Sequence, residues 1–242
     1  MMQKTQTKTL QLLSRFALPP NSLGYCGKDS AVEKLKKCIT SGVCDAVEKE
    51  ISKFIVLYPY LKTISEISNR DVFDYKVVEC FWLGNDLVKR AKPKHYDLLI
   101  KNFSSQGVLE SVIEDLRINT PKVFLPFHLF QVLHIGVGKC SGSVPFNMDS
   151  VNNCMIRWGE VEKITKSHVL VNLYSLTVKK GCYHIIKKRE KFSFDPEIIK
   201  GVKLGDMVSV HWRVPNKILE EEEIKNLEHW SCKTVEFINS GN

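Results

Sequence analysis

Cysteine and histidine side chains are the residues of this sequence that could carry chemistry. The chain has eight cysteines and seven histidines in 242 residues. No two cysteines are spaced as Cys-x-x-Cys, which argues against zinc ribbons and thioredoxin-type motifs. A thiolate is a soft metal ligand and a nucleophile, and an imidazole is a metal ligand and a proton acceptor. These residue types therefore indicate a metal site or thiol chemistry.

Cys26 lies in an unusual segment, Pro-Pro-Asn-Ser-Leu-Gly-Tyr-Cys-Gly, between two predicted helices. The two prolines are expected to end the first helix, and Gly24 and Gly27 let the loop backbone come close to a ligand. At the N-terminus of the next helix, the helix dipole would favour the Cys26 thiolate. The alternative is an ordinary turn between helices. The segment resembles one in an uncharacterised family of bacterial and archaeal proteins.

His128 and His134 lie in the apolar segment Phe124–Cys140. Residues six apart point to the same side of a strand but do not share one face of a helix. A metal site at these histidines needs further ligands, such as Cys26 or Cys154 from across a domain junction. The alternative is that both histidines are satisfied core residues.

A basic cluster follows in the second half of the chain, interleaved with Tyr183 and Phe192. Its members are Lys179, Lys180, Lys187, Lys188, Arg189 and Lys191. Basic grooves with aromatic side chains bind single-stranded nucleic acid, so an RNA-binding module is one hypothesis. The alternative is a solvated hairpin, and the acidic run Glu220–Glu223 argues against nucleic acid as the partner.

The pattern of apolar residues changes near residue 150. Helical periodicity before this point predicts an all-helical domain over residues 1–150, and 136–150 has the composition of a linker. Period-two patterns after it predict four or five short antiparallel strands. These strands are expected to close into a small β-barrel over residues 151–242, with a closing C-terminal helix. The predicted fold class is α+β.

The composition is that of an ordinary globular protein. Apolar residues make up 43% of the chain, and 35 basic against 27 acidic residues give a net charge of +8. These values exclude disordered and low-complexity classes. No stretch reaches the roughly 18 apolar residues of a membrane span. The basic N-terminus lacks a signal-peptide pattern. We therefore expect a cytoplasmic protein that contacts no membrane and keeps its cysteines as thiols.

The C-terminal part carries an ordered set of motifs. Cys154 precedes a strand with Gly159 and Val161, and Val202–Trp212 reads Val-Lys-Leu-Gly-Asp-Met-Val-Ser-Val-His-Trp. An acidic helix follows. Over about residues 152–230 this set resembles the small HypC-type chaperones of nickel–iron hydrogenase assembly, which are β-barrels.

The resemblance implies a function and a set of site residues. In that family a cysteine, matched here by Cys154, works with a scaffold protein to hold an iron that bears cyanide and carbon monoxide. It also contacts the precursor of the hydrogenase large subunit. His211 matches the strand histidine, beside which the thiol pKa is expected to fall. The resemblance thus predicts a non-enzymatic metallocentre assembly factor with iron as transient cargo.

The sequence leaves the enzymatic question open. The predicted metal or client ligands are Cys154, His211 and Cys26, with Cys26 facing Cys154 across the domain junction and with His128 and His134 as additional ligands. A thiol enzyme is the alternative, with Cys26 or Cys154 as the nucleophile and His128 or His211 as the base.

Overall fold

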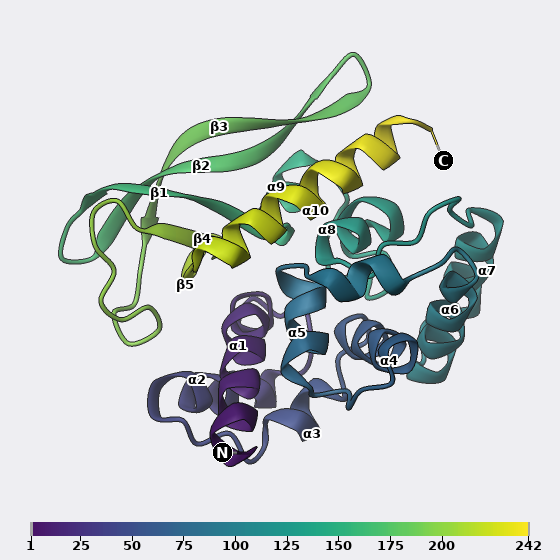
Figure 1. Cartoon of the computed structure of the whole chain (residues 1–242), viewed down its shortest axis with the longest axis horizontal. Helices are drawn as coiled ribbons and strands as arrows, with labels where there is room; N and C mark the ends of the chain where they lie inside the picture. The colour runs from purple at the N-terminus through teal and green to yellow at the C-terminus, as the bar shows by residue number, and fades with distance from the viewer. Residues whose placement is uncertain (1, 242) are drawn as a thin grey trace.

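The computed structural model describes residues 2–241 as ten α-helices, three short helical turns and five strands (Figure 1). The helical elements are α1 Met2–Ser22, η1 Asp29–Ala31, α2 Val32–Ser41, α3 Val47–Ile51, α4 Leu57–Ser68, α5 Tyr75–Trp82, η2 Asp86–Arg90, α6 His95–Gln106, α7 Glu110–Ile118, α8 His128–Phe130, the π-helical η3 Gln131–Gly136, α9 Met148–Cys154 and α10 Glu221–Asn239. The strands are β1 Arg157–Ile164, β2 His168–Lys179, β3 Cys182–Ser193, β4 Met207–His211 and β5 Val214–Ile218.

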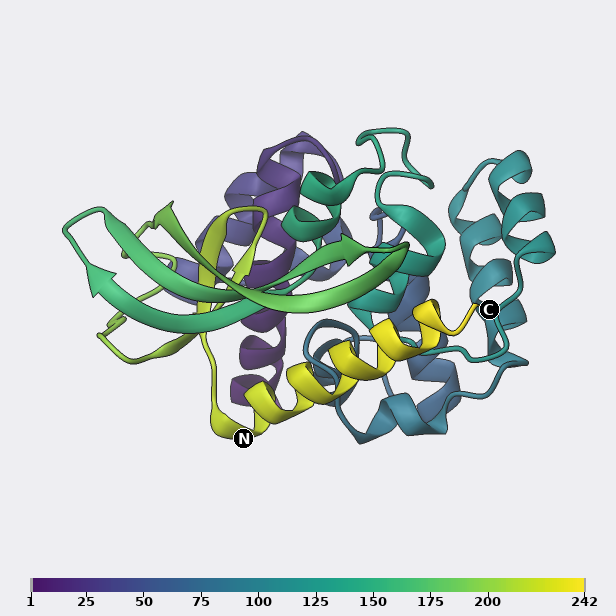
Figure 2. The same ribbon diagram turned by 90° about the horizontal axis from the view of Figure 1, so that it is seen from above.

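The five strands form one antiparallel sheet in the order β3-β2-β1-β4-β5. The β2–β3 hairpin is long and curved (Figure 2). Among residues 2–241 no ladder joins the outer strands β3 and β5, so the sheet is open by hydrogen bonding. The α+β class is confirmed, whereas the predicted closed barrel is not. The curled sheet buries a small core of its own around Val161, Val171, Val208 and Val210.

Gly159 explains how β1 can cross β2 closely. A Cβ atom at this position would lie 2.2 Å from the backbone oxygen of Asn172 and 2.7 Å from the Cα of Leu173. Backbone atoms of a paired strand cannot rotate away as a side chain can. The close crossing therefore requires glycine.

We predict that Gly159→Ala lowers the free energy of unfolding by about 2 kcal/mol, because the added methyl group overpacks the β1–β2 crossing. Urea denaturation followed by circular dichroism measures the change. The exposed neighbour Glu160 supplies the control, and Glu160→Ala is expected to change the same quantity by less than about 0.5 kcal/mol. Equal effects of the two substitutions would contradict the crossing geometry.

One hydrophobic core joins the helices to the sheet. It runs from Leu13 and Phe16 in α1 through Trp82 in α5 to Trp158 in β1 and Trp230 in α10. Helix α10 lies across the molecule between the sheet and the helices (Figure 1). Because the core is shared, a separate all-helical domain over residues 1–150 is not confirmed. The segment 136–150, which has the composition of a linker, lines part of an internal cavity and contains the first three residues of α9.

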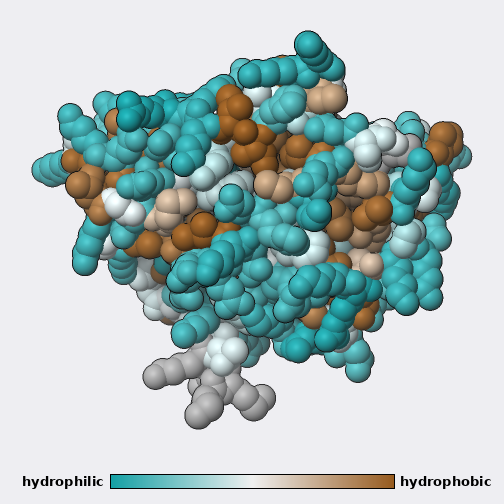
Figure 3. Space-filling view, turned by 45° about the horizontal axis from the view of Figure 1, so that its top comes forward, coloured by the Kyte–Doolittle hydropathy of each residue, from teal (hydrophilic) through white to brown (hydrophobic). Residues whose placement is uncertain are grey.

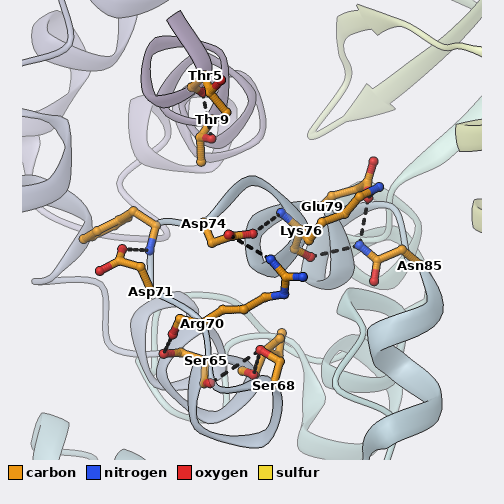
Figure 4. Close-up of polar contacts among 12 residues, drawn as sticks. Thr5, Thr9, Ser65, Ser68, Arg70, Asp71, Asp74, Lys76, Glu79 and Asn85 are labelled. Atoms are coloured by element: carbon orange, nitrogen blue, oxygen red, sulfur yellow. Dashed lines mark hydrogen bonds and ion pairs between the residues drawn. The ribbon is translucent and has the colours of Figure 1, made fainter. Parts of the chain in front are cut away.

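A polar network fixes the turn from α4 into α5 (Figure 4). The Asp74 carboxylate caps α5 by accepting the Lys76 backbone N–H at 2.8 Å, and it also pairs with Arg70 at 3.1 Å. The nearly buried Glu79 carboxylate accepts hydrogen bonds from the Lys76 ammonium and the Asn85 amide, both at 2.8 Å. A capped and doubly anchored α5 gives a fixed position to the aromatic residues at its end.

Two expectations about the first quarter of the chain differ from the structure. The Pro19-Pro20 pair lies inside α1, which continues to Ser22. Cys38 and Cys44 are joined by a disulfide with a Cα–Cα distance of 4.5 Å, so these two cysteines are not thiols. The other six cysteines are free. In the part of the chain described, no helix combines the length and the apolar character that a bilayer crossing requires.

Candidate functional site

His128, Cys154 and His211 meet at one point inside the protein. Each offers one ligand atom, and these three atoms lie within 4.8 Å of one another. The three side chains come from α8, the last residue of α9 and the last residue of β4. All three are buried. Buried nitrogen and sulfur donors at this separation are an arrangement that can close around a soft metal ion.

Cys154 is held by the short helix α9. A capping box begins this helix. The Ser150 N–H donates to the side-chain oxygen of Asn147 at 2.9 Å, and the Asn147 N–H donates to the Ser150 hydroxyl at 3.0 Å. Asn152 bonds both backbone groups of Leu176 in β2, at 2.8 and 2.9 Å. These contacts fix the end of α9 against the sheet, and they fix the position of Cys154 with it.

The proline pair in α1 orients His211. Pro20 has no N–H for the carbonyl of Phe16, its partner four residues earlier in a regular helix. The structure gives that carbonyl to His211, whose Nδ1 lies 2.7 Å from the oxygen. In the same way Pro19 frees the Arg15 carbonyl, which accepts the Asn216 amide at 3.2 Å. Two carbonyls that the prolines leave open thus anchor the β4–β5 hairpin.

This anchor leaves the other ring nitrogen of His211 free to bind a ligand. A neutral imidazole that donates from Nδ1 carries its lone pair on Nε2. The Nε2 atom is buried and has no hydrogen-bond partner within residues 2–241. Metal-binding histidines are commonly oriented in this way by a backbone carbonyl.

We predict that Pro20→Ala weakens Co²⁺ binding about 10-fold, because the new N–H competes with His211 for the Phe16 carbonyl. The same substitution removes a proline from a helix and is expected to raise the melting temperature. Isothermal calorimetry and thermal denaturation measure the two effects. A lower Co²⁺ affinity together with a higher melting temperature would indicate that Pro20 positions His211, because a general loss of structure would lower both quantities. An unchanged Co²⁺ affinity would contradict that role.

His128 is held by contacts on its edge and its faces. Its Nε2 lies 2.7 Å from the Cys154 carbonyl oxygen and 3.9 Å from the Cys154 sulfur. Nδ1 is buried and has no hydrogen-bond partner among the described residues. Trp82 packs against both histidines, with ring centroids 4.7 Å from His128 and 5.6 Å from His211. Each histidine thus keeps one nitrogen without a partner.

Burial keeps the site uncharged at neutral pH. It lowers the pKa of His128 to about 4 and the pKa of His211 well below its ordinary value. It raises the pKa of the Cys154 thiol well above its usual range, with a further increase from Cys26. The pKa of Cys26 rises to about 12, also through burial. The expected thiolate at Cys26 and the expected lowering of the Cys154 pKa by His211 are therefore wrong.

A cavity of about 60 Å³ adjoins the three residues. Its wall includes Cys26, Cys140 and the rings of Tyr25, Trp82 and Trp212, and it contains no Asp, Glu, Lys or Arg side chain. A volume of this size corresponds to about two water molecules. The cavity therefore has room for an ion together with about one small ligand.

Trp212 occupies a backbone conformation that bulky residues rarely adopt. It forms with Arg213 the two-residue turn between β4 and β5, and their φ angles are +48° and +65°. Asn and Gly are the usual residues in such turns. The Trp212 N–H bonds the Asn153 carbonyl at 2.7 Å, and its ring lies 4.6 Å from that of Tyr25. Strain of this kind is typical of functional sites, and here it places an indole on the cavity wall.

The structure places His134 away from this cluster. The segment is helical, so the two histidines point in different directions, and His134 packs between Tyr96 and Phe130 at centroid distances of 5.5 and 4.8 Å. Burial lowers the pKa of His134 to about 4. Its surroundings are those of a core histidine, and the metal-site cluster among residues 2–241 does not include it.

The basic cluster lies on the β2–β3 hairpin, whose tip projects from the molecule (Figure 1). Its members Lys179, Lys180, Lys187, Lys188 and Arg189 are exposed. Two of them have partners, since the Lys187 ammonium lies 4.7 Å from the Tyr174 ring centroid and Arg189 pairs with Glu162 at 2.9 Å. The face shown in Figure 3 is mostly hydrophilic, with separate hydrophobic patches. The hairpin thus presents exposed charged side chains, whereas the cluster of His128, Cys154 and His211 is buried.

Comparison with protein families gives one match. The model of DUF6390, a family of unknown function, covers residues 5–242. The chain belongs to this family. The DUF6390 match confirms the resemblance to an uncharacterised family and supports no assignment to the HypC-type chaperones. No curated protein and no solved structure matches the chain.

Sequence reasoning missed several residues that build the site in this DUF6390 chain. Trp82 and Trp212 on the cavity wall carried no recognisable signal, because their role depends on long-range packing. The Phe16 carbonyl was missed as well, although the proline pair that frees it is visible in the sequence. The adjacent Pro19 and Pro20 were the available signal for these open carbonyls, but adjacent prolines predict the end of a helix.

Proposed function

We propose that this protein is a non-enzymatic metallocentre assembly factor that holds a soft metal ion or metal fragment at His128, Cys154 and His211. One observation carries the proposal: three ligand atoms from three distant parts of the chain lie within 4.8 Å of one another beside a cavity. Buried polar side chains normally have hydrogen-bond partners. A bound cation would give the unpartnered Nε2 atom of His211 its missing interaction.

The donor set fits iron as the cargo. A thiolate and neutral imidazoles are soft or intermediate ligands that suit low-spin iron, and they suit zinc as well. The cavity leaves space for about one small ligand, such as a cyanide or a carbon monoxide, on the iron. The bound iron would be the cargo. The protein would orient the iron and exclude water from it. Cys154 would lose its proton on loading, and both histidines are already neutral.

The resemblance to HypC-type chaperones supports the same proposal. Its two matched residues, Cys154 and His211, belong to the three-residue cluster. His128 lies outside the stretch that carries the resemblance and adds a third ligand. By the same resemblance, the proposed partners are a hydrogenase large-subunit precursor or an iron scaffold protein. We place the activity in the cytoplasm, where the six free thiols would persist; the Cys38–Cys44 disulfide lies outside the three-residue cluster.

The two alternative functions receive less support. A thiol enzyme needs a reactive thiolate, whereas burial keeps Cys154 protonated. An RNA-binding module would use the exposed hairpin, where ion pairing and ring contact already engage Arg189 and Lys187. Neither alternative uses the convergence of the two histidines with Cys154.

An anaerobic affinity purification from the native host tests the proposal. The tagged protein is compared with Cys154→Ser and with Cys140→Ser, which changes another buried cysteine of the same cavity. Metal analysis and mass spectrometry of bound proteins are the readouts. We expect iron and a hydrogenase-assembly component with the wild type and with Cys140→Ser, and neither with Cys154→Ser.

The same purification can overturn the proposal. Identical metal content and identical partners for all three forms would remove the role of Cys154. RNA recovered in a salt-sensitive manner and lost in Lys187→Glu/Lys188→Glu would instead favour the nucleic-acid hypothesis.

A further inference from the structure

When the site holds a bare divalent ion, the compensating charge must come from cysteine. No acidic or basic side chain lines the cavity, and an imidazole that binds a metal ion is neutral. A bare divalent ion bound to the Cys154 thiolate alone would leave a net charge of +1 in a cavity without charged side chains. An uncompensated charge in such surroundings is strongly disfavoured. One further thiolate would make the loaded site neutral.

Two other cysteines line the same cavity, Cys26 and Cys140. They differ in their surroundings. Cys26 follows Tyr25, whose ring lies 4.6 Å from that of Trp212, and the Trp212 N–H bonds the carbonyl of Asn153, the residue before Cys154, at 2.7 Å. Cys140 lies in the segment that follows η3. Cys26 is also the more exposed of the two. Cys26 is therefore the better placed source of the second negative charge.

The loop that carries Cys26 is built to hold it in place. The buried Asn21 side chain donates to the carbonyls of Cys26 and Lys28 at 2.7 and 3.0 Å. Gly27 has a φ of +79°, and a Cβ there would lie 2.4 Å from the Phe54 ring. Ser143 bonds the Tyr25 carbonyl at 3.0 Å. These contacts give the loop one conformation, with Tyr25 on Trp212 and Cys26 on the cavity wall.

We propose that Cys26 is a second thiolate ligand when the site holds a bare divalent soft metal ion, so that Cys26, Cys154, His128 and His211 surround the ion. This inference rests on the proposed function and specifies the ligand set for a bare ion, since an iron that already carries cyanide is charge-balanced without Cys26. Cys26 is not in the three-residue cluster of the described residues, so its side chain turns inward when the ion binds. Each thiol gives its proton to solvent as its sulfur bonds the metal, and two thiolates balance the two positive charges. Four ligands of this kind are typical of tetrahedral coordination.

Cobalt(II) alone serves as the probe. The purified protein, with its metal removed, is titrated anaerobically with Co²⁺, and the sulfur-to-cobalt charge-transfer absorption per bound ion is measured. We expect Cys26→Ser to retain about half of the wild-type absorption and to bind Co²⁺ at least about 10-fold more weakly. The matched variant Cys140→Ser is expected to keep the wild-type absorption and affinity. Circular dichroism verifies that each variant is folded. If Cys26→Ser does not fold, Cys26→Ala is used in its place.

The outcomes separate this inference from the proposed function. Full absorption in both Cys26 variants would overturn the second thiolate while leaving the proposed function in place. Half absorption in Cys140→Ser, with full absorption in Cys26→Ser, would also overturn it. Co²⁺ binding that neither Cys154→Ser nor His211→Ala weakens would remove the proposed site, and the role of Cys26 with it.

Discussion

Replacing Cys154 by serine is expected to lower the affinity for Co²⁺ at least about 100-fold, which corresponds to about 3 kcal/mol. Cys154 is the one sulfur donor among the three clustered residues, and it supplies negative charge to a cavity without acidic side chains. A serine hydroxyl is a harder and far less acidic ligand than a thiol. Competition with a coloured chelator under anaerobic conditions measures the affinities.

The Cys154→Ser result is interpreted against two further variants. His211→Ala removes a ring nitrogen and is expected to weaken binding by about 10-fold or more. Cys140→Ser changes a cavity cysteine outside the proposed ligand set and is expected to leave the affinity unchanged. Equal losses for Cys154→Ser and Cys140→Ser would mean that the cavity as a whole, and not the cluster, determines binding.

Acid is expected to destabilise the metal-free protein steeply between pH 6.5 and about 4. Burial lowers the pKa of His128 and His134 to about 4 and lowers that of His211 well below its ordinary value. Each histidine then takes up a proton mainly on unfolding, where its pKa is about 6.5. Because the unfolded state binds more protons, their stabilisation is complete above pH 6.5 and is lost as the pH falls. Three such groups give a slope of about 4 kcal/mol per pH unit.

Urea denaturation at half-unit intervals from pH 7.5 to 5 measures this slope. The variant His128→Gln carries one titrating group fewer, so its slope should be smaller by about 1.4 kcal/mol per pH unit. Glu50 does not interfere in this window. Hydrogen bonds from Lys34 and Lys53 lower its pKa from 4.5 to about 2, so its contribution is lost as the pH falls from about 4.5 to about 2. A flat stability profile from pH 6.5 to 5 would contradict the buried, neutral histidines.

The α+β class could be predicted because it depends on local patterns. Period-two residues predicted β1 to β4, and helical periodicity predicted helices before residue 150. The closed barrel depended on pairing between β3 and β5, which no local pattern specifies. Strand β5 contains Pro215 and lies at the sheet edge, where a missing backbone N–H is tolerated. Long-range strand pairing was therefore the part of the fold that the sequence could not predict.

The proline pair shows why a local rule failed at a functional position. Prolines inside a helix are costly when the carbonyls they leave open are unsatisfied. Here Asn216 and His211 satisfy those carbonyls from strands almost 200 residues later. The cost is offset by contacts that only the tertiary structure contains. Helix continuation and histidine orientation are thus two results of the same packing.

The candidate site could be predicted in its members but not in its grouping. Cys154, His211, Cys26 and His128 all line the cavity that the structure contains. Spacing could not separate His128 from His134, because this depends on the π-helical turn that follows α8. The protonation states of His128 and Cys154 could also not be predicted from the sequence, since their pKa values depend on burial. The role of these residues in metal binding stays a prediction.

The bond between His211 and the Phe16 carbonyl spans 195 residues of chain. During synthesis, helix α1 leaves the ribosome before β4 and β5, with two backbone acceptors open, and their partners are made 195 and 201 residues later. Until then the cluster lacks one of its two imidazoles and the anchor that orients it. Under the proposed function, the site would therefore be completed only after β4 has been made, and metal loading would follow that step.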